Sequence, residues 1–207
     1  MIIKHRGVEP RLDESVFVAP TAVICGDVTL GSQARVMYGA VINSEASAVS
    51  VGMCCIICEN AVIRATHVED IDHPVRIGEH VFISPHATLL GCQVASHAYI
   101  ATGATVLQGA KVGKGAVVAV GALVHAGTNI PDGFFLAPNC VAIGNPAAIY
   151  GPGDQDAVVN AIKSIAFTKT AFGVMPLPED RVTTMARVTE IRSREFESHF
   201  SDIVIKA

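Results

Sequence analysis

Cysteine and histidine are the side chains of this sequence with the most chemistry to offer, because they bind transition metals and exchange protons. The sequence has six cysteines and eight histidines. Cys55 and Cys58 have the spacing of half a zinc site or of a redox pair, but no second CxxC and no HxxxH motif follows them. The pair lies inside an apolar run, so we expect both thiols to be structural. The even number of cysteines does not predict disulfides, because the chain is neither short nor marked for secretion.

Composition limits what the other residues can do. The chain has 207 residues, is 50% apolar and 16% charged, and carries a formal net charge of −4. Its mean hydropathy is +0.44 and its isoelectric point is about 6.0. No apolar run approaches the roughly 18 to 20 residues that a membrane helix needs, the acidic balance argues against a nucleic-acid surface, and the first residues lack the apolar core of a secretory signal. We therefore expect one cytoplasmic domain without a membrane span.

An internal repeat of six residues indicates the elements that must position these side chains. A branched aliphatic residue recurs at this interval, and a small residue follows most of these by four positions, often directly after a glycine. The aliphatic positions are Val18, Ile24, Leu30, Val36, Ile42, Val51, Ile57, Ile63, Ile77, Ile83, Leu89, Val94, Ile100, Val106, Val112, Val118, Val124, Ile130 and Leu136. The small positions are Ala22, Ala34, Ala40, Ala46, Cys55, Ala61, Ala87, Ala98, Ala104, Ala110, Ala116 and Ala122.

A period of six fits neither an α-helix, whose apolar stripe recurs every 3.6 residues, nor a hairpin strand that alternates at two throughout. It predicts short parallel strands joined by tight corners, three to a coil, around a narrow prism whose interior takes one large and one small side chain per strand. Residues 18–141 then form about seven triangular coils of about 18 residues each. A β-sandwich with glycine-rich turns would instead need turn signals roughly every 8 to 12 residues. The expected fold class is therefore an all-β solenoid, a parallel β-helix.

Two interruptions and a change of pattern complete the chain. The step from Ile42 to Val51 is widened, and residues 64–76 are polar and must loop out from the prism. After residue 150 the pattern becomes helical, so we expect a β-helix domain over residues 1–150 and a helical segment over residues 151–207. Because a solenoid has open ends and unpaired strand edges, we expect this segment to pack along the prism or across a neighbouring subunit.

Two helices are expected in this segment. Asp154 is placed to cap the first, and Gly173 lies where that helix should end, followed by Pro176 and Pro178. The apolar face of the first helix consists of Val158, Ile162, Ile165 and Ala166. That of the second consists of Val182, Met185, Val188 and Phe196.

With this pattern, residues 10–172 resemble the γ-carbonic anhydrase-like branch of the left-handed β-helix, hexapeptide-repeat (transferase) superfamily. The resemblance rests on the widened step NSEASAVSV, the loop after AVIRATH, the segment PVRIGEHVFISPHATLLGC and the closing AIGNPAA. It implies a homotrimer of left-handed β-helices. In active members of the family three histidines, two from one chain and one from its neighbour, bind a zinc or iron ion whose water attacks carbon dioxide.

Other residues occupy the three histidine positions of the family in this sequence. The corresponding residues are Arg64, Pro85 and Leu90. A guanidinium repels a dication, and proline and leucine side chains have no lone pair to donate. Ile63 and Leu89 fall on the same face of successive coils, so Arg64 and Leu90 stack, as two ligands from one chain should. We therefore expect that the chain does not bind the family metal and lacks carbonic anhydrase activity.

Three positions that support the metal in the family are also altered, and correspond to Asn43, Glu45 and Cys58. We expect Arg64 to replace the charge of the metal and to pair with Glu45, within the chain or across a subunit boundary. The cleft either binds a small anion or carboxylate, or is closed by this ion pair, and we favour the closed form. The residues of this candidate inter-subunit cleft are Asn43, Glu45, Cys58, Arg64, Pro85, His86 and Leu90.

A zinc or iron site shifted from the family position is an alternative. Its candidate ligands are His67, His73 and His86. His80 and His97 occupy equivalent corners of adjacent coils, about 5 Å apart, and form either a metal-binding pair or a surface ladder.

The remaining three histidines are not expected to serve such a site. His125 shares the column of Arg64 and Leu90 but lies two coils, about 10 Å, beyond Leu90. His5 and His199 are expected to be exposed and without function.

Three functions follow from these alternatives. The first is a metal-free homotrimer with a structural or small-ligand-binding role, and the second is an acyltransferase that holds acyl-coenzyme A between subunits and uses a histidine as general base. The candidates for that base are His67, His73, His86 and His125. The lack of a Lys and Arg cluster for the nucleotide phosphates argues against the second function. The third is a carbonate dehydratase with a relocated metal, and the sequence favours the first.

Overall fold

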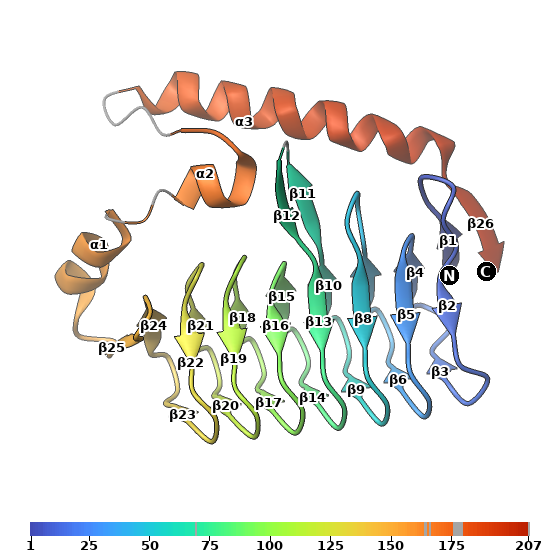
Figure 1. Ribbon diagram of the computed structural model, residues 1–207, viewed down its shortest axis with the longest axis horizontal. Coiled ribbons are helices and arrows are strands. Elements are labelled where there is room, and N and C mark those ends of the chain that lie inside the picture. The colour runs from blue at the N-terminus through green and yellow to red at the C-terminus, as the bar shows by residue number, and fades with distance from the viewer. Residues whose placement is uncertain (69, 164, 166, 176–179, 207) are drawn as a thin grey trace.

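Three parallel β-sheets form the sides of a prism in the computed structural model, and helices cover one end and one side of it (Figure 1). The structure describes residues 1–68, 70–163, 165, 167–175 and 180–206. The eight parallel strands of the first sheet are β1 (Ile2–Lys4), β4 (Val23–Cys25), β7 (Val41–Asn43), β10 (Val62–Arg64), β15 (Thr88–Leu90), β18 (Thr105–Val106), β21 (Leu123–Val124) and β24 (Val141–Ile143). The second sheet contains β2 (Arg11–Leu12), β5 (Val28–Leu30), β8 (Val49–Val51), β13 (Val75–Ile77), β16 (Gln93–Val94), β19 (Lys111–Val112) and β22 (Asn129–Ile130). The third sheet contains β3 (Phe17–Val18), β6 (Arg35–Val36), β9 (Ile56–Ile57), β14 (Phe82–Ile83), β17 (Tyr99–Ile100), β20 (Val117–Val118) and β23 (Phe135–Leu136).

The strand register follows the six-residue repeat. Ile63 pairs with Ile42 on one side and Leu89 on the other, so that large aliphatic side chains stack from coil to coil. The predicted small positions are buried as well, except that Ala46 in the widened step is half-buried. The largest fully buried aliphatic side chains are Ile24, Leu30, Ile42, Ile57, Ile63, Ile83, Leu89, Ile100, Ile130 and Leu136. The predicted parallel β-solenoid is therefore confirmed.

Glycine is required in the coils for two separate reasons. At corners such as Gly109 and Gly121 the backbone has φ of 72° and 65°, in the left-handed region that L side chains rarely adopt. At Gly52 the reason is space, since a Cβ there would lie 2.6 Å from the carbonyl carbon of Gly78 in the next coil. The tight stacking of coils thus excludes any larger residue at Gly52.

The polar segment predicted to loop out from the prism forms an antiparallel hairpin. Its strands are β11 (Thr66–Val68) and β12 (Ile71–His73), and Figure 1 shows the hairpin projecting from the prism toward the long C-terminal helix. The hairpin leaves the first sheet directly after Arg64 and returns to the second sheet at Val75. It therefore emerges beside the candidate cleft.

Among the described residues that follow the solenoid are three α-helices, one more than expected. They are α1 (Gln155–Lys163), α2 (Phe167–Phe172) and α3 (Arg181–Phe196). Asp154 lies directly before α1 and its carbonyl accepts from Val158 N, but its carboxylate accepts from Gly151 N rather than capping the helix. Ile165 lies between α1 and α2, and Gly173 follows the end of α2 as predicted. Ala166, Pro176 and Pro178, also assigned to this region, lie outside the described residues.

Helix α3 lies along the first sheet and runs back toward the N-terminal coil (Figure 1). Its predicted apolar face is wrong in part. Val188 is buried, but Val182 and Met185 are 83% and 51% exposed. Thr184 and Val188, one turn apart, are the buried residues of the helix. The helix is thus placed by small and charged side chains, which a search for apolar periodicity does not detect.

Both outer edges of the first sheet are closed by antiparallel strands. Strand β25 (Ala148–Tyr150) pairs with β24, and β26 (Ile203–Lys206), which the sequence did not predict, pairs with β1. The 3₁₀ helix η1 (Glu197–Ser201) connects α3 to β26. The expectation that the C-terminal segment covers a solenoid edge is therefore confirmed.

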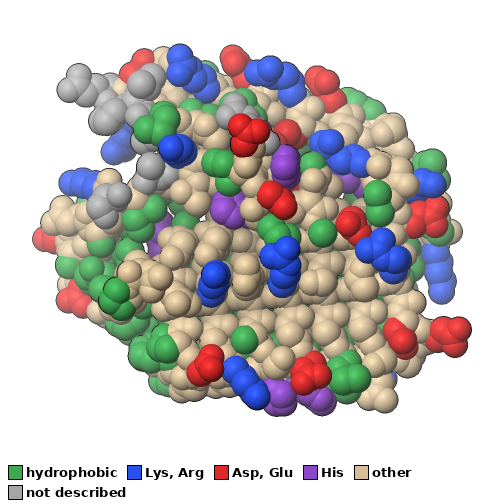
Figure 2. Space-filling model, in the orientation of Figure 1, with side chains coloured by type: hydrophobic (Ala, Val, Ile, Leu, Met, Phe, Trp, Pro, Cys, Tyr) green, Lys and Arg blue, Asp and Glu red, His purple; other side chains and the backbone are tan. Residues whose placement is uncertain are grey.

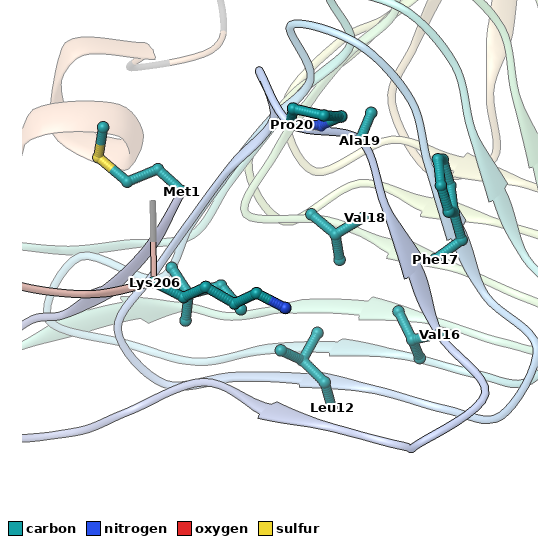
Figure 3. A pocket seen from close by; sticks show the side chains of 9 residues that line it. Met1, Leu12, Val16, Phe17, Val18, Ala19, Pro20 and Lys206 are labelled. Carbon is teal, nitrogen blue, oxygen red and sulfur yellow. The ribbon is translucent and has the colours of Figure 1, made fainter.

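The inside of the first coil opens as an apolar cavity of about 380 Å³ (Figure 3). Leu12, Val16 and Val18 line its floor, and Lys206 at the end of β26 reaches across it. Such a lining offers little for acid–base chemistry. On the face shown in Figure 2, Lys and Arg side chains are interspersed with Asp and Glu and form no single basic patch. None of the helices in the described part of the chain has the length and apolar character needed to span a lipid bilayer.

Candidate functional site

The centre of the candidate cleft is a column of side chains at the carboxyl ends of neighbouring strands. Arg64 on β10 pairs in register with Asn43 on β7 and with Leu90 on β15. Cys25 on β4 extends the column by one strand beyond Asn43. The predicted stacking of Arg64 with Leu90 is confirmed, because each of these residues directly follows a buried aliphatic of the hexad.

Glu45 is held beside this column by its neighbour Asn43. The Asn43 side chain accepts a hydrogen bond from Glu45 N at 2.8 Å and donates through Nδ2 to Glu45 Oε1 at 2.9 Å. Glu45 itself has a positive φ of 49°, which turns its side chain back over the strand end. The widened step after β7 thus serves to place one buried carboxylate.

Arg64 and Glu45 form the predicted ion pair within a single chain. Arg64 Nη2 lies 2.7 Å from Glu45 Oε1, with the two side chains 29% and 5% exposed. The contact is ionic and poorly aligned for hydrogen bonding, since the buried Nε and Nη2 atoms of Arg64 have no hydrogen-bond partner among the described residues. The guanidinium therefore neutralises the carboxylate and keeps unused donors.

The C-terminal segment covers this pair. The Arg64 guanidinium lies 5.1 Å from the ring centroid of Phe196, and that of Arg192 lies 4.7 Å from the same ring. His199 Nε2 is 3.5 Å from Glu45 Oε2. No local feature of the sequence indicated the contacts of Arg64 and Glu45, because each joins residues far apart in the chain. In addition, helix α3 carries no continuous apolar stripe.

The space around Arg64 and Glu45 also contains buried charged side chains from helix α3. Burial lowers the pKa of Arg192, and the nearby positive charge of Arg64 lowers it further. Burial raises the pKa of Glu195, although its ion pair with Arg192 acts in the opposite direction. Two guanidinium groups and two carboxylates thus share a poorly hydrated space under α3.

Cys58, Pro85 and His86 lie at the other end of the same strands. Cys58 N donates to Ile83 O, and His86 N donates to Glu59 O, which places the two residues at equivalent corners of adjacent coils, before β10 and before β15. Burial raises the pKa of the Cys58 thiol. Cys55 is also buried, and its thiol donates to Gly78 O at 3.0 Å. One chain therefore does not unite all the predicted cleft residues, because strand β10 separates Arg64 from these corners.

The alternative ligand set of His67, His73 and His86 is not assembled within one chain. His67 pairs with Asp72 across the hairpin and His73 with Thr66, so the two imidazoles point to opposite faces. His73 Nε2 contacts Thr170 O at 3.1 Å. His86 lies at the corner that precedes β15, at the opposite end of the strands from the hairpin, so a site built from His86 with His67 or His73 would need a second chain.

The other histidine predictions have mixed outcomes. The rings of His80 and His97 stack with centroids 5.2 Å apart, as predicted. His5, expected to be exposed, is only 1% exposed, and its ring stacks on His199 at 4.3 Å. That expectation was wrong because β26 pairs with β1 and brings the two distant residues together.

His125 lies two strands beyond Leu90, as the register predicted. It is 4% exposed, its ring lies 5.6 Å from that of Phe167, and its Nδ1 has no partner in the described part of the chain. Burial lowers the pKa of His125. The folded protein therefore keeps this imidazole neutral over part of the range in which the unfolded chain protonates it.

This difference predicts an acid-sensitive contribution to stability. The unfolded chain binds more protons below its histidine pKa of about 6.5, so the free energy of unfolding should fall as the pH drops from that value through the lowered pKa of His125. In the variant His125→Leu this fall in the free energy of unfolding at low pH should disappear. The control variant His97→Leu, changed at an exposed corner, should show the same fall as the wild type. Urea unfolding at several pH values measures the effect, and equal pH profiles for His125→Leu and the wild type would contradict it.

Comparison with curated proteins gives two γ-carbonic anhydrases of Arabidopsis thaliana among the relatives. The chain is 44% identical over 95 residues to "Gamma carbonic anhydrase 3, mitochondrial" and 39% identical over 93 residues to "Gamma carbonic anhydrase 1, mitochondrial". These segments cover 45% and 44% of this chain. The chain is therefore similar to γ-carbonic anhydrases over somewhat less than half of its length. It spans only 37% and 34% of the length of those two relatives, and no family model matches it.

Solved structures support the fold of this chain. A Bacillus cereus protein described as a "putative acetyltransferase" matches with a TM-score of 0.58 and 22% identity, over 97% of this chain and 98% of that one. A hexapeptide transferase family protein from Anaplasma phagocytophilum matches with a TM-score of 0.50 and 22% identity, over 93% of this chain and 97% of the other. The fold is the left-handed β-helix of the hexapeptide-repeat proteins.

The residues present do not fit the metal that the γ-carbonic anhydrase resemblance implies. Two of the three corresponding positions, Arg64 and Leu90, stand side by side in the column, and the third is Pro85. None of these side chains donates a lone pair to a metal, and the guanidinium already contacts Glu45. At the positions that the resemblance assigns to the ligands, these three side chains therefore offer no donor set for a dication.

Proposed function

We propose that this γ-carbonic anhydrase-like chain is a homotrimeric structural subunit without carbonic anhydrase activity. The observation that carries the proposal is the ion pair between Arg64 and Glu45 at 2.7 Å, in the column where the family binds its metal. A fixed positive charge there opposes a dication, and Leu90 beside it offers no donor atom. The ion pair takes the place of the metal and closes the cleft.

Two features of the chain support a trimer. The cleft residues fall into two groups at opposite ends of neighbouring first-sheet strands, one with Arg64 after β10 and one with His86 before β15, so their union requires a second copy. Helix α3 also leaves Val182 and Met185 exposed, which a neighbouring subunit would cover. A trimer with a threefold arrangement of clefts satisfies both features. We place this trimer in the cytoplasm, although two relatives are named as mitochondrial proteins.

Carbon dioxide hydration tests the proposal directly. The purified full chain, loaded separately with zinc and with ferrous iron, should hydrate carbon dioxide no faster than the buffer in a stopped-flow pH-indicator assay. The triple variant Arg64→His/Pro85→His/Leu90→His restores the family's imidazoles and serves as the matched comparison. Light scattering should give three times the chain mass for the wild type. Metal-dependent hydration by the wild type, or a monomer in solution, would overturn the proposal.

A small anion or carboxylate is the one ligand that a specific observation favours. Arg64 keeps Nε and Nη2 without hydrogen-bond partners among the described residues, and a carboxylate is their natural acceptor. A rise in melting temperature with acetate or bicarbonate that is absent in Arg64→Ala would assign this role to the cleft. If neither anion raises the melting temperature, the cleft is closed by the ion pair and the structural role stands.

The acyltransferase alternative rests on fold likeness alone. Among its four candidate general bases, His125 is buried beneath Phe167 and His73 contacts Thr170, whereas His86 is exposed at a corner. Because the sequence also lacks a Lys and Arg cluster for the nucleotide phosphates, acetyl-coenzyme A should leave the melting temperature unchanged. A saturable rise would favour acyl transfer over the structural role.

A further inference from the structure

Four potential metal ligands converge where the C-terminal segment meets the first two coils. His5 follows β1, Cys25 ends β4, His199 lies in η1, and Asp202 immediately precedes β26. Each offers one ligand atom, and these four atoms all lie within 4.8 Å of one another. It is the one such group of three or more His, Cys, Asp and Glu side chains in the described part of the chain.

Asp202 holds the two imidazoles in place. Its Oδ1 is 2.6 Å from His5 Nδ1, its Oδ2 is 2.8 Å from His199 Nδ1, and the two rings stack at 4.3 Å with an angle of 23° between their planes. The main-chain pairing of β26 with β1 places Lys4 opposite Ile203. It therefore also holds the neighbouring residues His5 and Asp202 close together. The imidazoles are thus oriented by backbone structure as well as by the carboxylate.

Cys25 supplies a second, independent observation. It is 4% exposed, and its sulfur has no hydrogen-bond partner among the described residues although it faces two imidazoles and a carboxylate. Its thiol adds a sulfur donor to two imidazoles and a carboxylate, and such a mixed set is one that zinc accepts. The sulfur is placed as a donor for something that the side chains alone do not provide.

We propose that His5, Cys25, His199 and Asp202 form a structural zinc site that clasps the C-terminal strand to the first coils. Two nitrogens, one sulfur and one oxygen are the donor types that zinc accepts, whereas calcium and magnesium prefer oxygen alone. Zinc bonds of about 2.0 to 2.3 Å in a tetrahedron put donor atoms about 3.5 Å apart. Small rotations of the four side chains from their present spacing reach that geometry.

Two features describe the proposed site with zinc bound, namely the protonation of Cys25 and the position of Glu45. Binding converts the thiol of Cys25 to a thiolate and releases its proton to solvent. His199 Nε2 now lies 3.5 Å from Glu45 Oε2, so Glu45 can hold the imidazole of a ligand in position. Four protein ligands leave no open coordination position, so the clasp has no role in hydration and does not depend on the proposed function of the Arg64 cleft.

Metal content and cobalt spectroscopy of the full chain test the clasp. After zinc loading and desalting, the wild type should retain about one zinc ion per chain, and cobalt should give the charge-transfer absorption of a thiolate ligand. The variant Cys25→Ser should lose that absorption, whereas the buried control Cys92→Ser should keep it. His199→Gln, a change at a partly exposed ligand, should weaken zinc binding by more than the roughly 10- to 100-fold that loss of a hydrogen bond to a ligand costs.

A melting experiment protects the test against variants that fail to fold. Zinc should raise the melting temperature of the wild type and of Cys92→Ser, and a chelator should reverse the rise. A wild type that retains no zinc after loading would overturn the proposal. So would folded Cys25→Ser and His199→Gln variants that bind zinc as tightly as the wild type.

Discussion

Replacing Ile63 with alanine is expected to lower the free energy of unfolding by about 2–5 kcal/mol. Ile63 is fully buried and lies in the middle of the aliphatic stack, between Ile42 and Leu89. The coils are held at strand spacing by main-chain hydrogen bonds, so the prism cannot collapse around the missing carbons. The cavity cost is therefore added to the lost burial.

Urea unfolding at neutral pH measures this effect. The matched control is Ile149→Ala, in the edge strand β25, where the side chain is 42% exposed and the expected loss is below about 1 kcal/mol. Equal losses for the two variants would show that the stacked interior contributes no more to stability than an edge strand. Because Ile63 directly precedes Arg64, the same variant is also expected to loosen the cleft.

Replacing Glu45 with glutamine is the second large change, with an expected loss of about 2 kcal/mol. Removing one partner of a fully buried ion pair costs about 3–5 kcal/mol, because the remaining charge stays unpaired and poorly hydrated. Arg64 is 29% exposed, so water relieves part of this penalty. The variant also replaces the anionic acceptor that Asn43 holds in place.

The control for this change is Glu9→Gln. Glu9 pairs with Lys4 at 3.2 Å on the surface, with the side chains 52% and 33% exposed, and its loss should cost about 0–1 kcal/mol. A cycle that combines Glu45→Gln with Arg64→Met isolates the coupling between the two charges. If Glu45→Gln and Glu9→Gln proved equally mild, the ion pair would not be the element that closes the cleft.

The hexad made much of the fold predictable. Each coil repeats the same contacts with its neighbours, so one large and one small position every six residues specify both burial and strand register. The register in turn predicted that Arg64 stacks on Leu90 and that His125 lies two strands beyond. The pairing of Arg64 with Glu45 followed from their place in adjacent coils and from opposite charge.

The C-terminal segment was not predictable in the same way. The sequence indicated helices but assigned α3 a face that is wrong in part, because Thr184 is buried and the Arg192 side chain is only 12% exposed, whereas Val182 and Met185 are exposed. It also gave no sign of β26, and so dismissed His5 and His199. Strand β26 is a short apolar segment whose partner, β1, lies at the opposite end of the chain.

The sequence by itself determined what repeats, namely the prism, its corners and the column of Arg64 and Leu90, and it indicated that a polar segment loops out from the prism. Tertiary structure alone decided where the C-terminal segment lies, and with it the cover over Glu45 and the convergence of His5 with His199. The physical reason is that contacts between coils recur and leave a period in the sequence. The docking of α3 and β26 occurs only once, through individual ion pairs and hydrogen bonds between residues far apart in the chain. It therefore leaves no period in the sequence.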